Sequence, residues 1–238
     1  MTTDFLKQLD GAIAPAIQPQ RAAGMRAYMR DQYDFLGIPT PERRAAAKSL
    51  LKQFKGNGAD ALLKQAQVLW DLPQREYQYI ALDLLAMHWK ELQVEDITAL
   101  LVLAQNKSWW DTVDGIAAIV GKVLRGSHSG MDAALDHDNM WVRRIAMLHQ
   151  LGWRDNTDQH RLFSYALKLA HEKEFFIQKA IGWALRDYAR HSPNEVRTFT
   201  LSEKSRLSAL SYREANRHLL GDTPVQRKNA RLNALCSE

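Results

Sequence analysis

The sequence predicts an all-α protein built from stacked helical pairs, and three observations support this fold class. Apolar residues recur at the three- and four-residue spacing of helices along the whole chain of 238 residues. Runs that alternate apolar and polar residues between tight turns, which indicate strands, are almost absent. The breaks between the periodic segments are short. We therefore expect roughly a dozen helices of about 10–17 residues in one continuous domain over residues 1–238.

A weak internal repeat indicates how these helices are organised. Four segments can be laid on one another, namely 77–81, 113–117, 142–146 and 177–181, and their starts are 36, 29 and 35 residues apart. Spacing of this size fits a helical-hairpin repeat in which each pair of helices is too small to bury its own apolar face. Stacked pairs would form a curved α-solenoid with a concave inner surface. A non-repetitive helical bundle is the alternative.

Glycine and proline mark the expected boundaries of the helices. Thr40 before Pro41 is typical of an N-cap with proline at the first helical position. Ser192 before Pro193 has the same form, and Glu195 would complete a capping box. The expected turns are Gly37–Pro39, Lys55–Gly58, Asp71–Pro73, Gly126–Gly130, Ser192–Pro193 and Gly221–Pro224.

The charge of the chain is uneven. Its 32 basic and 27 acidic residues give a net charge of +5. Residues 1–120 contain 13 basic and 14 acidic residues, whereas residues 121–238 contain 19 and 13. A basic half suits a polyanionic partner such as nucleic acid, although a small basic excess also serves solubility alone.

Targeting features are absent from the sequence. No segment approaches the roughly 18 consecutive apolar residues of a membrane span, and the N-terminus lacks the pattern of a secretory signal. The single cysteine, Cys236, has no internal partner for a disulfide. These features predict a cytoplasmic protein without a membrane partner.

The expected helix over residues 110–125 has one face that is not explained by core packing. Its core stripe consists of Val113, Ile116, Ala117, Val120 and Leu124. Trp110 and Asp114 lie one helical turn apart on a neighbouring face, above the small residues Ala118 and Gly121. This pair could stabilise a cationic sugar. Alternatively, Asp114 is a surface carboxylate or the partner of an arginine, and Trp110 packs beside Trp109.

The expected helix over residues 139–151 places Arg144 among apolar neighbours. A guanidinium in such surroundings needs a partner, because an unpaired buried charge is unfavourable. The partner is either an internal aspartate or a phosphate bound in bidentate fashion.

The expected helix over residues 174–190 has Trp183 on a basic face. Lys179, Arg186, Asp187 and Arg190 share this face, whereas residues 177, 180, 181, 184, 185 and 188 point inward. A tryptophan among cations can stack on a sugar or base while the cations contact phosphates. A tryptophan that covers a seam between two repeats is an equally good explanation.

Other chemistries have little support in the sequence. It contains no glycine-rich phosphate loop and no paired cysteines, and its eight histidines are scattered. We expect neither a metal site nor an organic cofactor.

Several segments, taken together, resemble the AlkD family of DNA alkylation-repair glycosylases. The resemblance is clearest at Ser108–Asp114 and extends through Phe35–Arg44, Arg75–Ala81, Met140–Arg144 and Glu174–Trp183. These segments span about residues 28–190 in the order of the family. The resemblance implies a right-handed superhelix of HEAT-like helical-hairpin repeats with a basic concave cleft for duplex DNA.

The resemblance also implies roles for individual residues. The catalytic aspartate of the family falls on Asp114, and its two sugar-facing tryptophans fall on Trp110 and Trp183. The arginine near the DNA backbone falls on Arg144, and a cleft tyrosine falls on Tyr28. Further expected DNA contacts are Thr40 and Arg43, from a family segment near the backbone, and the cations Lys179, Arg186 and Arg190.

The function implied by the resemblance is excision of purines alkylated at N3 or N7 from duplex DNA, by hydrolysis of the N-glycosidic bond. Such a purine is already cationic, so it leaves as a neutral base without a general acid, and one carboxylate could suffice where ordinary glycosidases need two. We expect a monomer without an obligate protein partner. The alternatives are a non-catalytic binder of distorted or branched nucleic acid on the same fold, and a HEAT-type protein scaffold.

Overall fold

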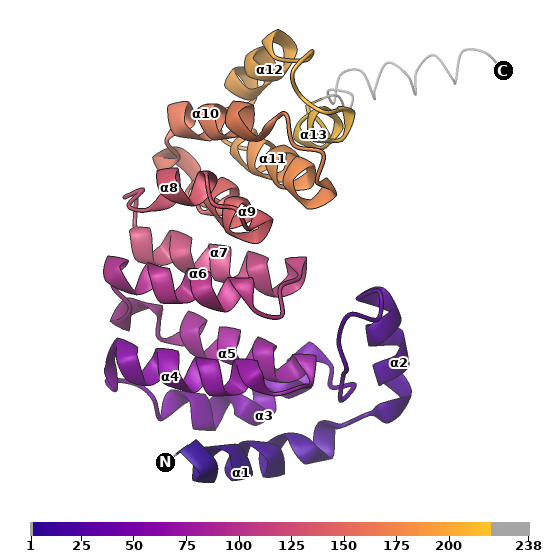
Figure 1. Ribbon diagram of the computed structural model, residues 1–238, viewed down its shortest axis with the longest axis vertical. Coiled ribbons are helices and arrows are strands. Elements are labelled where there is room, and N and C mark those ends of the chain that lie inside the picture. The colour runs from indigo at the N-terminus through magenta and orange to yellow at the C-terminus, as the bar shows by residue number, and fades with distance from the viewer. Residues whose placement is uncertain (1, 220–238) are drawn as a thin grey trace, which may run out of the picture. The chain divides into compact units, whose positions relative to one another are not determined.

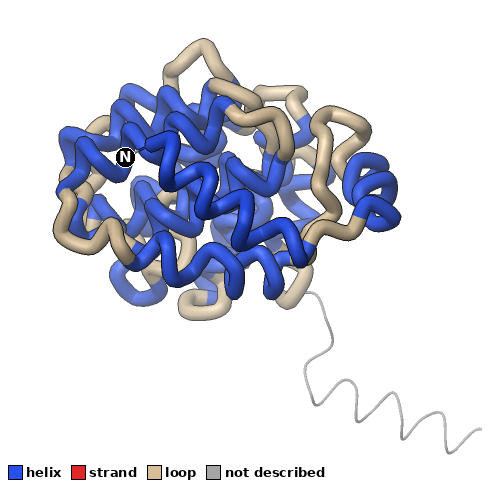
Figure 2. The backbone as a smooth tube through the Cα atoms, turned by 90° about the horizontal axis from the view of Figure 1, so that it is seen from below, coloured by secondary structure: helices blue, strands red, loops and turns tan. Residues whose placement is uncertain are grey.

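The structure is a computed structural model that describes residues 2–219, and most of these residues are helical (Figure 1). No strand occurs within this range, and Figure 2 shows helices joined by loops and turns. The predicted all-α class is therefore confirmed. The predicted turn at 221–224 and Cys236 lie outside the described residues.

The chain divides into two compact units, the first ending at Met131 and the second beginning at Asp132. The helices of the first unit are α1 (Thr2–Ile13), α2 (Pro19–Tyr28), α3 (Thr40–Lys52), α4 (Gly58–Asp71), α5 (Arg75–Met87), α6 (Ile97–Gln105) and α7 (Trp110–Leu124). Those of the second unit are α8 (Met131–Leu135), which begins at the boundary, α9 (Met140–Leu148), α10 (Gln159–Leu169), α11 (Phe175–Tyr188), α12 (Pro193–Ser202) and α13 (Ala209–Ala215). The single continuous domain, the superhelical curvature and the concave cleft stay predictions.

The first unit is a two-layered stack of helical pairs. Helices α3, α5 and α7 follow one another in one layer, while α4 and α6 lie in the other (Figure 1). Across the layers α4 packs against α5 and α6 against α7, and α1 covers α3. The fully buried side chains of this unit include Leu62, Trp70, Ile80, Leu84 and Leu100. Each pair therefore buries its apolar face against the next pair, as helical-hairpin repeats do.

In the second unit, α11 is the central helix. It packs against α9, α10, α12 and α13. The six residues of α11 that were predicted to point inward, from Ile177 to Tyr188, are all buried. The approach of α13 is so close that a Cβ at Gly182 would lie 2.5 Å from the Cβ of Glu214. A glycine on α11 is therefore what allows α13 to dock.

The sequence repeat coincides with equivalent places in the fold. Its four segments lie on α5, α7, α9 and α11, and each begins at the third or fourth residue of its helix. Helices α5, α7 and α11 each pack against the helix that precedes them in the chain. The repeat therefore marks the second helix of successive helical pairs.

Two predicted helix starts differ from the structure in their capping. Helix α3 begins at Thr40 itself, with Pro39 as its N-cap, because the N–H of Arg43 donates to the carbonyl of Pro39. Ser192 is the N-cap residue of α12, with Pro193 at the first position, but its side chain makes no capping hydrogen bond and the predicted capping box is wrong. The carboxylate of Glu195 accepts a hydrogen bond from Gln159 instead. Contacts with a neighbouring helix prevail here over the local capping interaction.

A long loop between α2 and α3 is held by one buried carboxylate. Glu76, on the first turn of α5, accepts hydrogen bonds from the backbone N–H groups of Leu36, Gly37 and Ile38 at 2.9–3.1 Å. Gly37 has φ of +83°, and a Cβ on it would lie 2.1 Å from the carbonyl oxygen of Gln18. The residue before α2 and the loop after it therefore meet at a point where only glycine fits.

This contact predicts a large difference between two glycine substitutions. Gly37→Ala should destabilise the protein by about 3 kcal/mol or more, since strain in the left-handed region adds to a clash with backbone atoms. Gly56→Ala is the matched control, because Gly56 also has a positive φ of +81° but has open space around its Cβ position. The control should lose only about 1 kcal/mol. Chemical denaturation measures both, and equal losses would contradict the close approach at Gly37.

Candidate functional site

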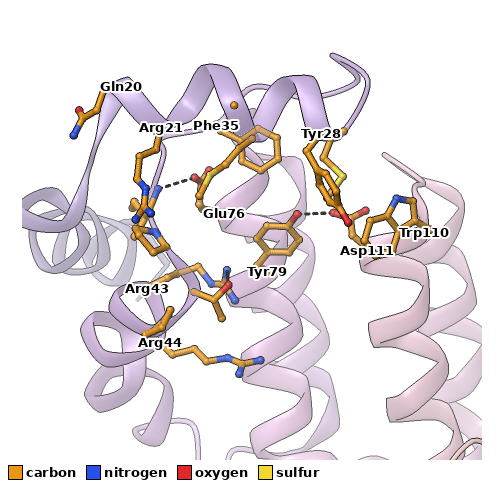
Figure 3. Close-up of a pocket in the computed structure, with 17 residues that line it drawn as sticks. Gln20, Arg21, Tyr28, Phe35, Arg43, Arg44, Glu76, Tyr79, Trp110 and Asp111 are labelled. Atoms are coloured by element: carbon orange, nitrogen blue, oxygen red, sulfur yellow. Dashed lines mark hydrogen bonds between the residues drawn. The ribbon is translucent and has the colours of Figure 1, made fainter. Parts of the chain in front are cut away.

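The first unit contains a cavity of about 890 Å³ between α2 and the helices α3, α5 and α7 (Figure 3). Four residues that the sequence predicted for the site line it: Tyr28, Thr40, Arg43 and Trp110. They come from α2, α3 and α7, so the fold brings together residues that are as many as 82 positions apart in the chain. The remaining lining residues are Gln20, Arg21, Gly24, Met25, Met29, Phe35, Ile38, Pro39, Pro41, Arg44, Glu76, Tyr79 and Asp111.

Trp110 stands at one end of this cavity, at the first residue of α7. The edge of the Tyr28 ring meets it, with ring centroids 6.0 Å apart and planes at 79° (Figure 3). Asp114 is half-buried one helical turn further along α7. The predicted core stripe of α7 is buried throughout, which leaves Trp110 and Asp114 outside the core. The structure thus places both residues as the helical periodicity predicted, although Asp114 does not line the cavity itself.

The first turn of α7 is fixed by a buried ion pair that sequence reasoning missed. Both oxygens of Asp111 accept hydrogen bonds from Arg75, at 2.7 and 3.0 Å, and Arg75 is completely buried. The guanidinium also donates to the carbonyl of Lys107 and to the hydroxyl of Thr112. Its face lies 3.9 Å from the ring centroid of Tyr33. These bonds satisfy the arginine on all sides, as a buried charge requires.

Tyr79 completes this network on the side of the cavity. Its hydroxyl donates to Asp111 at 2.6 Å (Figure 3). Burial and the neighbouring Asp111 carboxylate raise the pKa of the Tyr79 hydroxyl well above its usual range. Tyr79 is therefore held as a hydrogen-bond donor to Asp111 at the edge of the cavity.

The wall formed by α3 is basic. Arg43 is buried and donates to Asp83 at 3.2 Å and, over a longer 3.5 Å, to the hydroxyl of Thr40. Arg44 donates to the second oxygen of Asp83 from an exposed position. The guanidinium of Arg43 lies over the ring of Tyr79, 4.8 Å from its centroid. Burial lowers the pKa of Arg43 from its usual value.

In the second unit, Arg144 is buried and the carbonyl of Phe176 is one of its hydrogen-bond acceptors. The guanidinium also lies 5.9 Å from the centroid of the Phe176 ring, which packs against Trp141. The expected need of Arg144 for a partner is therefore met, at least in part, by a backbone carbonyl on α11.

The basic face of α11 is tied to α13 by Glu214, which the sequence reasoning also missed. Lys179 donates to one oxygen of Glu214 at 2.7 Å, and Arg186 donates to the other. Trp183, between these two cations on α11, is half-buried, and Arg190 is exposed. Lys179 and Arg186 thus have an internal carboxylate as partner, and a phosphate bound here would share them with Glu214.

The described residues contain neither a candidate metal site nor a candidate membrane span. No group of three or more histidine, cysteine, aspartate or glutamate residues among them could hold a metal ion. Between residues 2 and 219, no helix has both the length and the apolar character needed to cross a membrane.

The fold and this cavity define a helical-repeat protein with a site of aromatic and basic residues. The chain belongs to the family of DNA alkylation repair enzymes, because the model of that family matches residues 10–219. A solved structure described as a predicted DNA alkylation repair enzyme from Enterococcus faecalis is similar, with 33% sequence identity and a TM-score of 0.79. The match covers 86% of this chain and 97% of that one. Among curated proteins the chain has no match.

The buried pair predicts a strong effect of Arg75 on stability. Arg75→Met should lower the free energy of unfolding by about 3–5 kcal/mol, since it leaves the buried Asp111 carboxylate without its counterion. Arg44→Met is the matched control, because that arginine is 64% exposed and Asp83 keeps Arg43 as a partner. The control should change stability by about 0–1 kcal/mol. Urea denaturation tests both, and a mild effect at Arg75 would contradict the proposed anchoring of α7.

The Glu214 cluster predicts a dependence of stability on pH. Hydrogen bonds from Lys179 and Arg186, and their charges, lower the pKa of the Glu214 carboxyl in the folded protein. Folding is therefore stabilised by the ionised form above the unfolded value of about 4.5, and this contribution is lost as pH falls through the lower folded value.

Glu214→Gln should accordingly reduce stability by about 1–3 kcal/mol at pH 7, and the difference from the parent protein should shrink below pH 4.5. Glu203→Gln serves as control, since the ion-pair partner of Glu203 is the exposed Arg206. Melting curves between pH 3 and pH 7 give the comparison. A difference that does not vary with pH would show that the Glu214 charge does not contribute.

Proposed function

We propose that the protein is a DNA glycosylase that excises cationic N3- and N7-alkylated purines from duplex DNA by hydrolysing the N-glycosidic bond. Membership of the family of DNA alkylation repair enzymes supports alkylated DNA as the substrate. The position of Trp110 and Asp114 is the observation that supports glycosylase activity on cationic purines. An indole and a half-buried carboxylate stand one turn apart on a face of α7 that the core does not use.

The reaction needs little more than stabilisation of positive charge. When the bond between C1′ and the purine nitrogen breaks, its electron pair neutralises the cationic base, so no proton has to be supplied to the leaving group. The positive charge passes to the deoxyribose ring. Water then adds to C1′ and loses one proton, which leaves an abasic sugar with a hydroxyl. A single carboxylate can serve this reaction, whereas hydrolysis of a neutral leaving group requires a second, protonated acid.

In this proposal Asp114 provides the negative charge beside the developing sugar cation, and the face of the Trp110 indole adds a cation–π interaction. Electrostatic catalysis of this kind depends on groups that are already in place. The buried pair of Arg75 and Asp111 supports that condition, because it fixes the turn of α7 on which Trp110 stands.

The remaining predicted residues are proposed as DNA contacts within their own units. In the first unit these are Tyr28, Thr40 and Arg43, which line the cavity beside Trp110. In the second unit they are Trp183 as the second sugar-facing indole, and Arg144, Lys179, Arg186 and Arg190 for the DNA backbone.

The test is release of free base from duplex DNA, measured by chromatography. N7-methylguanine and N3-methyladenine, both cationic as nucleosides, should be released. Duplexes with hypoxanthine or uracil should give no release above background, because no protonated acid is proposed for the site. Efficient release of a neutral base would contradict the single-carboxylate mechanism, and binding of DNA without any release would favour the non-catalytic binder.

Asp114→Asn should reduce the single-turnover rate of release by about 10²- to 10³-fold while DNA binding and melting temperature are retained. Asp60→Asn is the matched control, since Asp60 is exposed on α4 and the change alters the net charge equally. The control should release base at the parental rate. If Asp114→Asn is as active as the control, Asp114 has no part in the reaction.

A further inference from the structure

Helix α2 is separated from the helices of the first unit by a cavity, and one face of α2 lines that cavity. None of its ten residues is buried. Arg21, Gly24, Met25 and Tyr28 lie along the side that lines the cavity, and Figure 3 shows Arg21 and Tyr28 pointing from α2 toward the helices below. A helix normally buries an apolar stripe against its neighbours. Here the corresponding space is open, at about 890 Å³, and falls within the size range of small-molecule sites.

The opposite wall of this cavity presents flat aromatic surfaces. Phe35 and Tyr79 have ring centroids 6.5 Å apart, and Trp110 stands beside Tyr28 at the end of the cavity. Tyr28 is 71% exposed, so its ring is accessible to a ligand. Aromatic rings in this arrangement suit a planar ligand such as a nucleobase. Every base has a flat face on which an aromatic ring can stack.

The charges around the cavity favour an anion. Three arginines line it, Arg21, Arg43 and Arg44, against two carboxylates. Both carboxylates already accept several hydrogen bonds, Glu76 from three backbone N–H groups and Asp111 from Arg75 and Tyr79. The positive side chains are thus the groups with hydrogen-bonding capacity left for a ligand.

Arg43 has such capacity although it is buried. It is only 5% exposed, and its Nε has no hydrogen-bond partner within the described part of the chain. Its bond to Thr40 is also long, at 3.5 Å. A buried donor without an acceptor is unfavourable, and more so when the group is charged. Because Nε is enclosed by protein atoms, an anion in the cavity would bind the guanidinium through Nη1, the donor of that long bond.

We propose that the cavity under α2 binds one nucleoside monophosphate unit, with the base against the rings of Tyr28, Phe35 and Tyr79 and the phosphate on Arg43 and Arg21. The unit is either a free nucleotide or an unpaired nucleotide of a DNA strand, since both present the same chemistry. The site shares Tyr28 and Arg43 with the DNA contacts proposed above, but its occupation does not depend on base excision at Asp114.

The test is isothermal titration calorimetry of the full-length protein with dAMP, deoxyadenosine and inorganic phosphate. We expect dAMP to bind at least tenfold more tightly than either fragment, because only dAMP contacts the rings and the arginines together. Arg43→Met and Tyr28→Ala should each weaken dAMP binding at least tenfold. Asp83 keeps Arg44 in the first variant, and Tyr28 is exposed, so both should fold.

Arg21→Ala and Arg26→Ala form a matched pair on the same helix. Both arginines are exposed, but only Arg21 lines the cavity, whereas Arg26 pairs with Asp31 and Asp34. Binding of dAMP should weaken in Arg21→Ala and stay unchanged in Arg26→Ala. Equal effects of the two variants would show that dAMP follows the general charge of the surface, and would overturn the site.

Competition identifies the source of the nucleotide unit. If a duplex with one unpaired adenosine displaces dAMP and the fully paired duplex does not, the unit belongs to a DNA strand. If neither duplex displaces it, the unit is a free nucleotide. Absence of dAMP binding at millimolar concentration, or binding unaffected in Arg43→Met and Tyr28→Ala, overturns the proposal. Base release by the same preparation would show that the proposed function stands independently.

Discussion

The buried pair of Arg75 and Asp111 is the interaction on which the geometry of the first unit depends. Two opposite charges removed from water are favourable only if every donor and acceptor is satisfied. Here Arg75 uses Asp111, Lys107 and Thr112, and Tyr79 donates to the remaining capacity of Asp111. Because α5 provides the arginine and α7 the aspartate, the pair fixes the register of two adjacent repeats and the place of Trp110.

The repeat itself contains the information needed to predict this pair. Arg75 and Asp111 each stand two positions before the start of a repeat segment, at Tyr77 and Val113, and are therefore 36 residues apart, as the segments are. Equivalent positions on adjacent helices of one layer face each other, so opposite charges there predict a contact. The helical periodicity likewise predicted the buried stripes of α7 and α11 and the position of Trp110 outside the core.

Other contacts that shape the site do not follow from the sequence repeat. The loop before α3 takes its conformation from three backbone bonds to Glu76, and α13 reaches Lys179 and Arg186 through Glu214. These contacts join segments that lie outside the repeat register, and no spacing in the sequence indicates them. The cavity under α2 arises in the same way, because it depends on where the loop holds a helix that buries none of its residues.

In the proposed mechanism the two aspartates at the start of α7 have different roles, structural for Asp111 and chemical for Asp114. Asp111 accepts hydrogen bonds from Arg75 and from Tyr79, so its charge is matched within the fold and its oxygens are occupied. A carboxylate so placed has little potential left to stabilise a cation outside the protein. Asp114 stands three residues further along α7 and is half-buried. A rigid first turn with one neutralised acid would thus present the second acid at a fixed place, which is the condition under which a single carboxylate stabilises a transition state.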